Sequence, residues 1–144
     1  MSIQLVVTKT PSAEIVSQLS GDLDLFNIAM TEIADRTPLA VLAVDAETGK
    51  VRGGISGRTS LGMLFIDIFF LPADLRGSGL GSKLLAAAED EARRRGCKSA
   101  ALYTMSFQAP GFYTRHGWNI FGEVPCDPPG TRRIFLSKDL SANP

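Results

Sequence analysis

The chain has 144 residues, of which 44% are hydrophobic and 21% charged, and fifteen basic residues balance fifteen acidic ones. This ordinary composition predicts a single domain over residues 1–144 that is large enough to bury a core. The zero net charge gives no general reason to expect nucleic acid or an anionic membrane as a partner, and no apolar stretch is long enough to span a bilayer.

The N-terminal part of the chain predicts a strand followed by a helical region. Residues 3–8 read IQLVVT, and their apolar and β-branched side chains favour a strand. Ser12 is a suitable N-cap for a helix with apolar residues at helical spacing. We expect Gly21 to interrupt that helix before a second helical stretch that reaches Ile33.

Strands alternate with two helical segments in the remainder of the chain. Apolar runs, turn residues and helical spacing predict strands over 39–44, 51–60, 63–71, 99–104, 119–124 and 132–136, a helix over 80–95, and a short helix that starts at Pro110. The full order is β-α-β-β-β-α-β-α-β-β. This order favours an α/β fold in which helices cover the faces of one mixed sheet, rather than separate domains.

A glycine-rich turn joins the apolar run 63–71 to the helix 80–95. It reads Arg76-Gly77-Ser78-Gly79-Leu80-Gly81, and Ser82 follows at once. A strand, a glycine turn and a helix N-terminus together form an anion site, because successive N–H groups point outward and glycine lets a phosphate approach the backbone. The turn therefore predicts a ligand that carries phosphate.

Two common phosphate-binding patterns fit this turn poorly. A nucleotide P-loop requires GxxxxGK followed by Ser or Thr, but the one Gly-Lys pair, Gly49-Lys50, precedes Val51 and lies in a predicted hairpin turn. A dinucleotide fold requires GxGxxG, and Ser82 stands where its third glycine should be. Neither a P-loop nor a dinucleotide site is therefore expected.

The pattern that fits is Arg-x-x-Gly-x-Gly, with Arg76, Gly79 and Gly81 at its fixed positions. It follows a strand and opens a helix, as an acetyl-coenzyme A site of the GNAT superfamily of N-acyltransferases does. The chain resembles this superfamily in the motif, in the position of the motif and in the order of its elements. The resemblance therefore covers nearly the whole chain.

A second segment, SFQAPGFYTRHGW over residues 106–118, carries the rest of the resemblance. Four of its residues match the superfamily's Asn-x-x-Ala-x-x-x-Tyr-x-x-x-Gly-aromatic pattern: Ala109, Tyr113, Gly117 and Trp118. Ser106 stands where Asn is usual, and Gln108 is a second candidate for that contact with the coenzyme.

The resemblance implies a fold, a cosubstrate and a set of binding residues. The fold is a GNAT-like α/β fold with a mixed, mostly antiparallel central sheet, helices on both faces and a splayed parallel strand pair. The cosubstrate is acetyl-CoA, and no metal is implied. The implied coenzyme-binding residues are Phe69, Phe70, Leu71, Arg76, Gly77, Ser78, Gly79, Leu80, Gly81, Ser82, Ser106, Gln108 and Phe112.

By the same resemblance, Tyr113 is the candidate general acid that protonates the departing sulfur. Thiol and phenol pKa values, roughly 8.5 and 10 in model compounds, are close enough for useful proton transfer. The alternative is a tyrosine that packs on the sheet with its hydroxyl in solvent.

Asp67 is the one ionisable residue of the run 63–71 and the candidate base that accepts a proton from the amine. A carboxylate in an apolar strand is costly unless it is paired or solvated in a cleft, and burial would raise its pKa. Strand alternation predicts that it shares a face with Phe69 and Leu71. The alternatives are an ion pair, to Arg58 or Arg52, and proton transfer through a chain of waters.

The sequence thus predicts an enzyme that moves an acetyl group from acetyl-CoA to a primary amine of a small molecule or peptide. The alternative is a non-catalytic acyl-CoA-binding sensor or interaction module. Nucleic acid and membrane are not expected as partners, and the oligomeric state is open, with a homodimer as the family-level expectation. Cys97 and Cys126 form no CxxC pair, and no secretion signal is recognised, so we expect a cytoplasmic protein.

Overall fold

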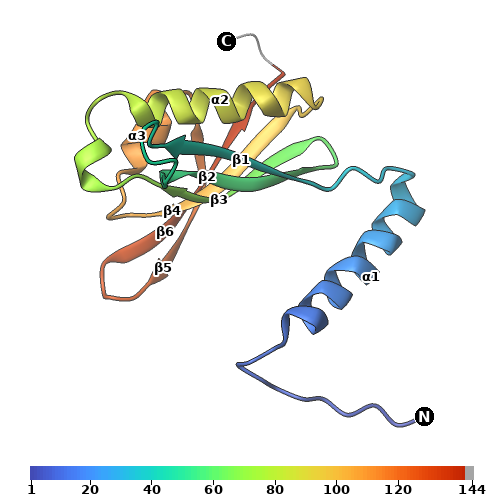
Figure 1. Cartoon of the computed structure of the whole chain (residues 1–144). Helices are drawn as coiled ribbons and strands as arrows, with labels where there is room; N and C mark the ends of the chain where they lie inside the picture. The colour runs from blue at the N-terminus through green and yellow to red at the C-terminus, as the bar shows by residue number, and fades with distance from the viewer. Residues whose placement is uncertain (142–144) are drawn as a thin grey trace. The chain divides into compact units, whose positions relative to one another are not determined.

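The computed structural model describes residues 1–141 of the chain (Figure 1). These residues separate into two units, Met1–Ala34 and the part from Asp35 on, and each unit is described by itself. No helix within the described residues is long and apolar enough to cross a membrane. The single domain predicted for residues 1–144 stays a prediction.

The first unit contains one helix, α1 (Ala13–Thr31). Ser12 caps it as predicted, because its Oγ accepts a hydrogen bond from the Ile15 N–H at 3.1 Å. The predicted break at Gly21 is wrong, since a single glycine costs a helix only about 1 kcal/mol and the helix continues through it. The strand predicted over residues 3–8 is also wrong, because this segment pairs with no strand among the described residues.

The second unit is built on a six-stranded sheet in the order β1-β2-β3-β4-β6-β5. All neighbouring pairs are antiparallel except β3 and β4, which confirms the mixed, mostly antiparallel sheet. The strands are β1 (Thr37–Val44), β2 (Val51–Ser60), β3 (Met63–Phe70), β4 (Ser99–Met105), β5 (Asn119–Cys126) and β6 (Thr131–Asp139).

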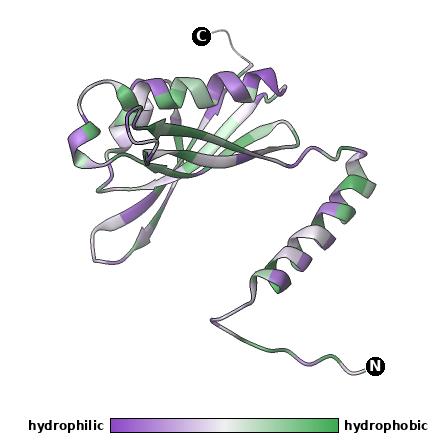
Figure 2. Cartoon of the chain, viewed as in Figure 1, coloured by the Kyte–Doolittle hydropathy of each residue, from purple (hydrophilic) through white to green (hydrophobic). Residues whose placement is uncertain are grey.

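Helix α2 (Leu80–Arg94) covers one face of this sheet, and the short helix α3 (Pro110–Arg115) lies near the N-terminal end of α2 (Figure 1). Polar and apolar patches alternate along α2 (Figure 2), as expected of a helix with one face on a sheet. A helix on the opposite face stays a prediction. The core between α2 and the sheet includes Leu64, Ile66, Leu84, Leu85, Ala88, Ala100, Leu102, Ile134 and Leu136.

The parallel strands β3 and β4 pair only along their first halves. Met63–Ile66 pairs with Ser99–Leu102, although β3 continues to Phe70 and β4 continues to Met105. The two strands are therefore unpaired with each other beyond Ile66. This confirms the predicted splayed pair and leaves backbone groups on that side of β3 free for another partner.

A β-bulge lies where the two strands part. The register between β2 and β3 passes from the Gly57–Ile66 pair to the Ser56–Ile68 pair, so Asp67 has no residue opposite it. The additional residue reverses the alternation of side chains, and Phe69 packs on the core that contains Ile66. The prediction that strict alternation continues through Asp67 to Phe69 is therefore wrong.

Candidate active site

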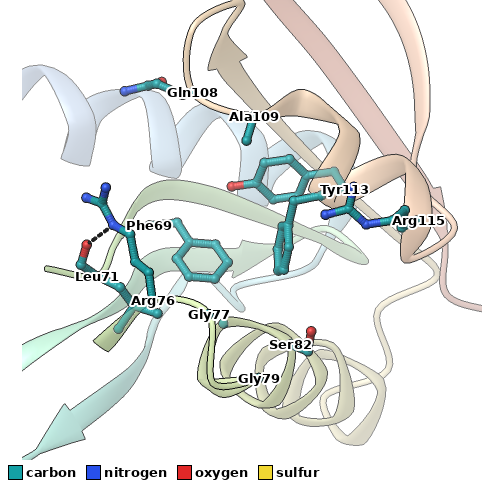
Figure 3. Close-up of a pocket in the computed structure, with 12 residues that line it drawn as sticks. Phe69, Leu71, Arg76, Gly77, Gly79, Ser82, Gln108, Ala109, Tyr113 and Arg115 are labelled. Carbon is teal, nitrogen blue, oxygen red and sulfur yellow. Dashed lines mark hydrogen bonds between the residues drawn. The ribbon is translucent and has the colours of Figure 1, made fainter. Parts of the chain in front are cut away.

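A cavity of about 500 Å³ lies between the end of β3, the glycine turn before α2, and α3 (Figure 3). Ten residues singled out from the sequence line it: Phe69, Leu71, Arg76, Gly77, Gly79, Gly81, Ser82, Gln108, Phe112 and Tyr113. Five others singled out there are not among its lining residues: Asp67, Phe70, Ser78, Leu80 and Ser106.

The glycine turn presents unpartnered N–H groups to this cavity. The first backbone hydrogen bond of α2 runs from the Lys83 N–H to the Gly79 carbonyl at 3.2 Å, so the N–H groups before it lie free at the helix start. Gly77 and Gly79 have φ angles of +82° and +85°, and a Cβ added to either would meet no atom within 4 Å. An anion can therefore approach the backbone of this turn closely.

Two contacts hold the glycine turn against the sheet and α3. The Nε of Arg76 donates a hydrogen bond to the Leu71 carbonyl at 2.8 Å, drawn as a dashed line in Figure 3. A Cβ on Gly81 would lie 3.5 Å from the Phe112 ring, so α3 packs directly on the first turn of α2. The turn is therefore fixed at both of its ends before any ligand binds.

Tyr113 lies on α3 inside a cluster of aromatic rings and is only 8% exposed. Its ring centroid is 6.2 Å from that of Phe69, 5.2 Å from Phe112 and 6.1 Å from Trp118. Burial disfavours the phenolate and raises the pKa of Tyr113 to about 12. The phenol is therefore protonated at neutral pH, and in Figure 3 its hydroxyl points away from Arg115.

A second cavity, of about 380 Å³, lies at the splayed ends of β3 and β4. Phe69, Gln108 and Tyr113 line both cavities, so the two meet at these three residues. Asp67 and Phe70, which do not line the first cavity, line the second. The site thus has one arm beside the glycine turn and a second arm that contains a carboxylate.

Asp67 is exposed, which matches the expectation of a carboxylate that is solvated in a cleft. The bulge turns the residue toward the second cavity, where water reaches it. Neither predicted ion pair forms: Arg52 pairs with Asp74 at 2.8 Å, and the Arg58 guanidinium lies 4.9 Å from the centre of the Phe65 ring. Within residues 1–141, no ion pair to Asp67 is formed, and its carboxylate faces the cavity.

Gln108 and Ser106 differ in their access to the site. The Gln108 Oε1 accepts a hydrogen bond from the Met105 N–H at 2.9 Å and one from the Thr104 hydroxyl at 3.3 Å, which leaves its Nε2 as a donor at the junction of the cavities. The Ser106 Oγ instead accepts a hydrogen bond from the Arg132 N–H at 3.0 Å and lines neither cavity.

Three residues near the cavities were missed as candidates from the sequence. Arg115 lines the first cavity, two residues after Tyr113 in the recognised segment, and this spacing could have indicated it. Tyr103 and Arg133 line the second cavity, but they come from β4 and β6, and no local pattern joins them. His116, at the end of α3, lies with its Nε2 3.0 Å from the Ser82 Oγ.

Comparisons with known proteins agree with this geometry. The model of the acetyltransferase (GNAT) family matches residues 12–118. A blasticidin-S acetyltransferase of Streptomyces morookaense is 40% identical over 113 residues, which are 76% of this chain and 83% of that protein. An acetyltransferase of Agrobacterium fabrum is 33% identical over 122 residues, covering 85% of this chain and 88% of the relative.

A solved structure extends the comparison to the fold. The crystal structure of a candidate acetyltransferase from Agrobacterium tumefaciens superposes with a TM-score of 0.86 and 31% identity. The match covers 95% of this chain and 99% of that one. This chain therefore shares its fold with that protein.

Proposed function

The chain belongs to the GNAT family of acetyltransferases, and we propose that it moves an acetyl group from acetyl-CoA to a primary amine of a small molecule or peptide. One observation carries this proposal: an anion-binding turn and an open carboxylate occupy two cavities that meet at Tyr113. Family membership as an acetyltransferase also disfavours the non-catalytic module that the sequence left open.

The first cavity suits the donor. The free N–H groups of residues 77–82 and the open space at Gly77 and Gly79 fit a pyrophosphate, and Arg115 adds a positive charge to the same cavity. The backbone of Phe69 to Leu71, unpaired on the β4 side, can bind an extended pantetheine arm as an added strand would bind. Gln108 offers its Nε2 to that arm.

The chemistry requires one bond to form, one bond to break and two protons to move. The amine nitrogen bonds to the acetyl carbon, and the bond from this carbon to sulfur breaks. Tyr113 holds a proton at its Oη throughout the neutral pH range and donates it toward the departing sulfur. Asp67, directly or through a chain of waters, accepts the proton that the amine loses.

The acceptor we propose is a small molecule in preference to a peptide. The Streptomyces relative is named for a small-molecule acceptor, blasticidin S, and it is 40% identical over 113 residues. The second cavity, at about 380 Å³, lies in the size range of small-molecule sites. These two observations support the same acceptor class, and a homodimer stays a family-level prediction.

A panel of primary amines tests the proposal. The protein is incubated with acetyl-CoA and amino acids, polyamines, aminoglycosides, blasticidin S or short peptides, and free thiol and product mass are measured. We expect thiol release that depends on the amine and a product that carries one additional acetyl group. Tight binding of acetyl-CoA without turnover of any amine would instead support the non-catalytic module.

A further inference from the structure

The second cavity contains two opposite charges, Asp67 and Arg133, that both face open space. Both residues are exposed, and neither takes part in an ion pair within the described residues. The guanidinium of Arg133 instead lies 5.3 Å from the centre of the Tyr103 ring, in a cation–π contact. The cavity thus holds a cation and an anion that are available to a ligand.

Among the described residues, several arginines of this unit have carboxylate partners, whereas Arg133 has none and lines the second cavity. Its neighbour Arg132 lies 3.5 Å from Glu123, and Arg52 lies 2.8 Å from Asp74. Arg132 does not line the second cavity, although it precedes Arg133 directly on β6. Two adjacent arginines on one strand therefore have different environments, one paired and one directed to the cavity.

The sheet order determines how the two charges are spaced. Asp67 lies on β3, Tyr103 on the neighbouring β4, and Arg133 on β6, the strand that follows. Because the guanidinium stacks over the Tyr103 ring, the positive charge lies over β4. Asp67 lies just beyond the paired part of β3 and β4, so the carboxylate and the guanidinium are separated by at least about one interstrand spacing, on the order of 5 Å.

We propose that Arg133 binds an anionic group of the acceptor, so that the acceptor is a small amine that also carries a carboxylate. This inference rests on the proposed function and names its substrate class. The amine faces Asp67 and Tyr113, and the carboxylate faces the Arg133 guanidinium, which the Tyr103 ring contacts. A planar guanidinium forms two parallel hydrogen bonds to a carboxylate, which a neutral amide cannot match.

Charge complementarity distinguishes this acceptor from a polyamine. A polyamine would bring a second cation toward Arg133, and like charges at short distance repel. A compound with an amine and a carboxylate, by contrast, satisfies both charged side chains of the cavity. An acceptor whose amine and carboxylate are a few bonds apart matches the separation of Asp67 and Arg133.

The test uses three ω-amino acids, glycine, β-alanine and γ-aminobutyrate, each beside its own carboxamide, at saturating acetyl-CoA. We expect the wild type to show a kcat/KM at least about 10-fold higher for the best carboxylate than for its carboxamide. In Arg133→Gln this ratio should fall about 10- to 100-fold toward unity, mainly through a lower kcat/KM for the carboxylate. A wild type that uses both equally, or a variant that keeps the ratio, overturns the inference.

Arg132→Gln is the matched control, because Arg132 is the adjacent arginine of β6 and pairs with Glu123 outside the cavity. It should keep the wild-type ratio. An unchanged affinity for acetyl-CoA in Arg133→Gln verifies that the variant is folded. 2-Aminoethylphosphonate separates the anion types: preference for it over β-alanine would overturn the carboxylate assignment.

A binding measurement distinguishes a failure of this inference from a failure of the proposed function. Calorimetry measures γ-aminobutyrate binding to the CoA-loaded protein, which requires no turnover. If no amine is acetylated but binding of γ-aminobutyrate is lost in Arg133→Gln, the carboxylate site stands and the acetyl transfer fails. If amines are acetylated with no dependence on Arg133 in rate or binding, the inference fails and the proposed function stands.

Discussion

Tyr113 combines deep burial with a position at the junction of two cavities. The surrounding rings of Phe69, Phe112 and Trp118 exclude water from the phenol and raise its pKa to about 12. Below that pH the side chain is a proton donor and not a base. The role of general acid therefore suits it, and the role of the base is left to Asp67 or water.

The raised pKa of Tyr113 has a consequence for stability at alkaline pH. The neutral phenol is favoured in the folded state, whereas the unfolded chain ionises near pH 10, so the stabilisation is fully present below about pH 10 and is lost as pH rises toward about 12. We expect the free energy of unfolding to fall by about 1.4 kcal/mol near pH 11 through this residue alone.

Urea denaturation at about pH 9 and about pH 11 measures this loss. Tyr113→Phe should lack this part of the pH dependence, because phenylalanine does not ionise. An identical alkaline loss in the wild type and in Tyr113→Phe would contradict the effect of burial.

Asp67 is the one residue of β3 at which the bulge places a carboxylate in the second cavity. Asp67→Asn removes the charge and the base but keeps the shape, so we expect kcat/KM for amines to fall about 10-fold or more while acetyl-CoA affinity stays constant. Asp90→Asn, an outward-facing residue of α2 that pairs with Arg93, serves as the control. An unchanged kcat/KM in Asp67→Asn would contradict the role of Asp67 as the base and would favour proton transfer through a chain of waters.

At the scale of elements, the start and the end of α2 both depend on glycine. Gly79 caps the N-terminus with a φ of +85°, and Gly96 follows the C-terminus with a φ of +83°. A Cβ at either position would meet no atom within 4 Å. The two positions thus carry equal strain on substitution, but only Gly79 lines a cavity.

This symmetry supplies a test of the pyrophosphate site. Gly79→Val puts a branched side chain into the space reserved for the anion, and we expect acetyl-CoA to bind about 100-fold more weakly or worse. Gly96→Val imposes the same left-handed strain at the other end of α2, with a cost of about 1–2 kcal/mol in stability but no loss of affinity. Calorimetric titration measures both, and equal affinity in the two variants would refute the site.

Glu89 connects α2 to the strands that hold α3. Its side chain is 6% exposed; its Oε1 lies 2.6 Å from the Lys138 Nζ, and its Oε2 accepts a hydrogen bond from the Trp118 Nε1 at 3.3 Å. Lys138 also donates a hydrogen bond to the His116 carbonyl at 2.8 Å. The network therefore joins α2 to the end of α3, the helix that carries Tyr113.

This ion pair joins a buried carboxylate to a partly buried lysine, and breaking it should lower the free energy of unfolding more than breaking a surface pair. Glu89→Gln keeps an acceptor for Trp118 but leaves the Lys138 cation without its carboxylate, and we expect a loss of about 3 kcal/mol in the free energy of unfolding. Glu91→Gln should change it little, because the Glu91 side chain is 34% exposed and pairs with Arg94 and Arg95 at the helix surface. Urea denaturation measures the free energy of unfolding of both variants. Similar losses in the two would contradict a stabilising role for the network.

For the whole molecule, local patterns predicted the elements from residue 37 onward and the start of α1, but not the absence of a strand over residues 3–8 or the continuity of α1 through Gly21. Alternating or continuous apolar runs bounded by turns identified all six strands of the sheet, because burial of one face dictates that pattern. IQLVVT over residues 3–8 has the same composition but lacks a partner strand, and β-propensity without pairing does not form a strand.

The two arms of the site differed in how far the sequence revealed them. The first cavity, proposed to bind acetyl-CoA, is lined mainly by two contiguous segments, the glycine turn and the stretch 106–118. A sequence motif can therefore indicate it. The second arm joins Asp67, Tyr103 and Arg133 from three strands, and their meeting depends on sheet order, on the β4–β6 register and on a bulge. No spacing along the chain encodes those features.

The central claim is that acetyl transfer occurs where the two cavities meet, at Tyr113. Its most direct test is the rate of amine-dependent thiol release from acetyl-CoA by wild type and Tyr113→Phe, together with the dissociation constant of acetyl-CoA for each. We predict that kcat falls about 100-fold or more in the variant while the dissociation constant stays within about 3-fold, because only the phenol hydroxyl, the proposed proton donor, is removed. Equal turnover by the two proteins would contradict the claim.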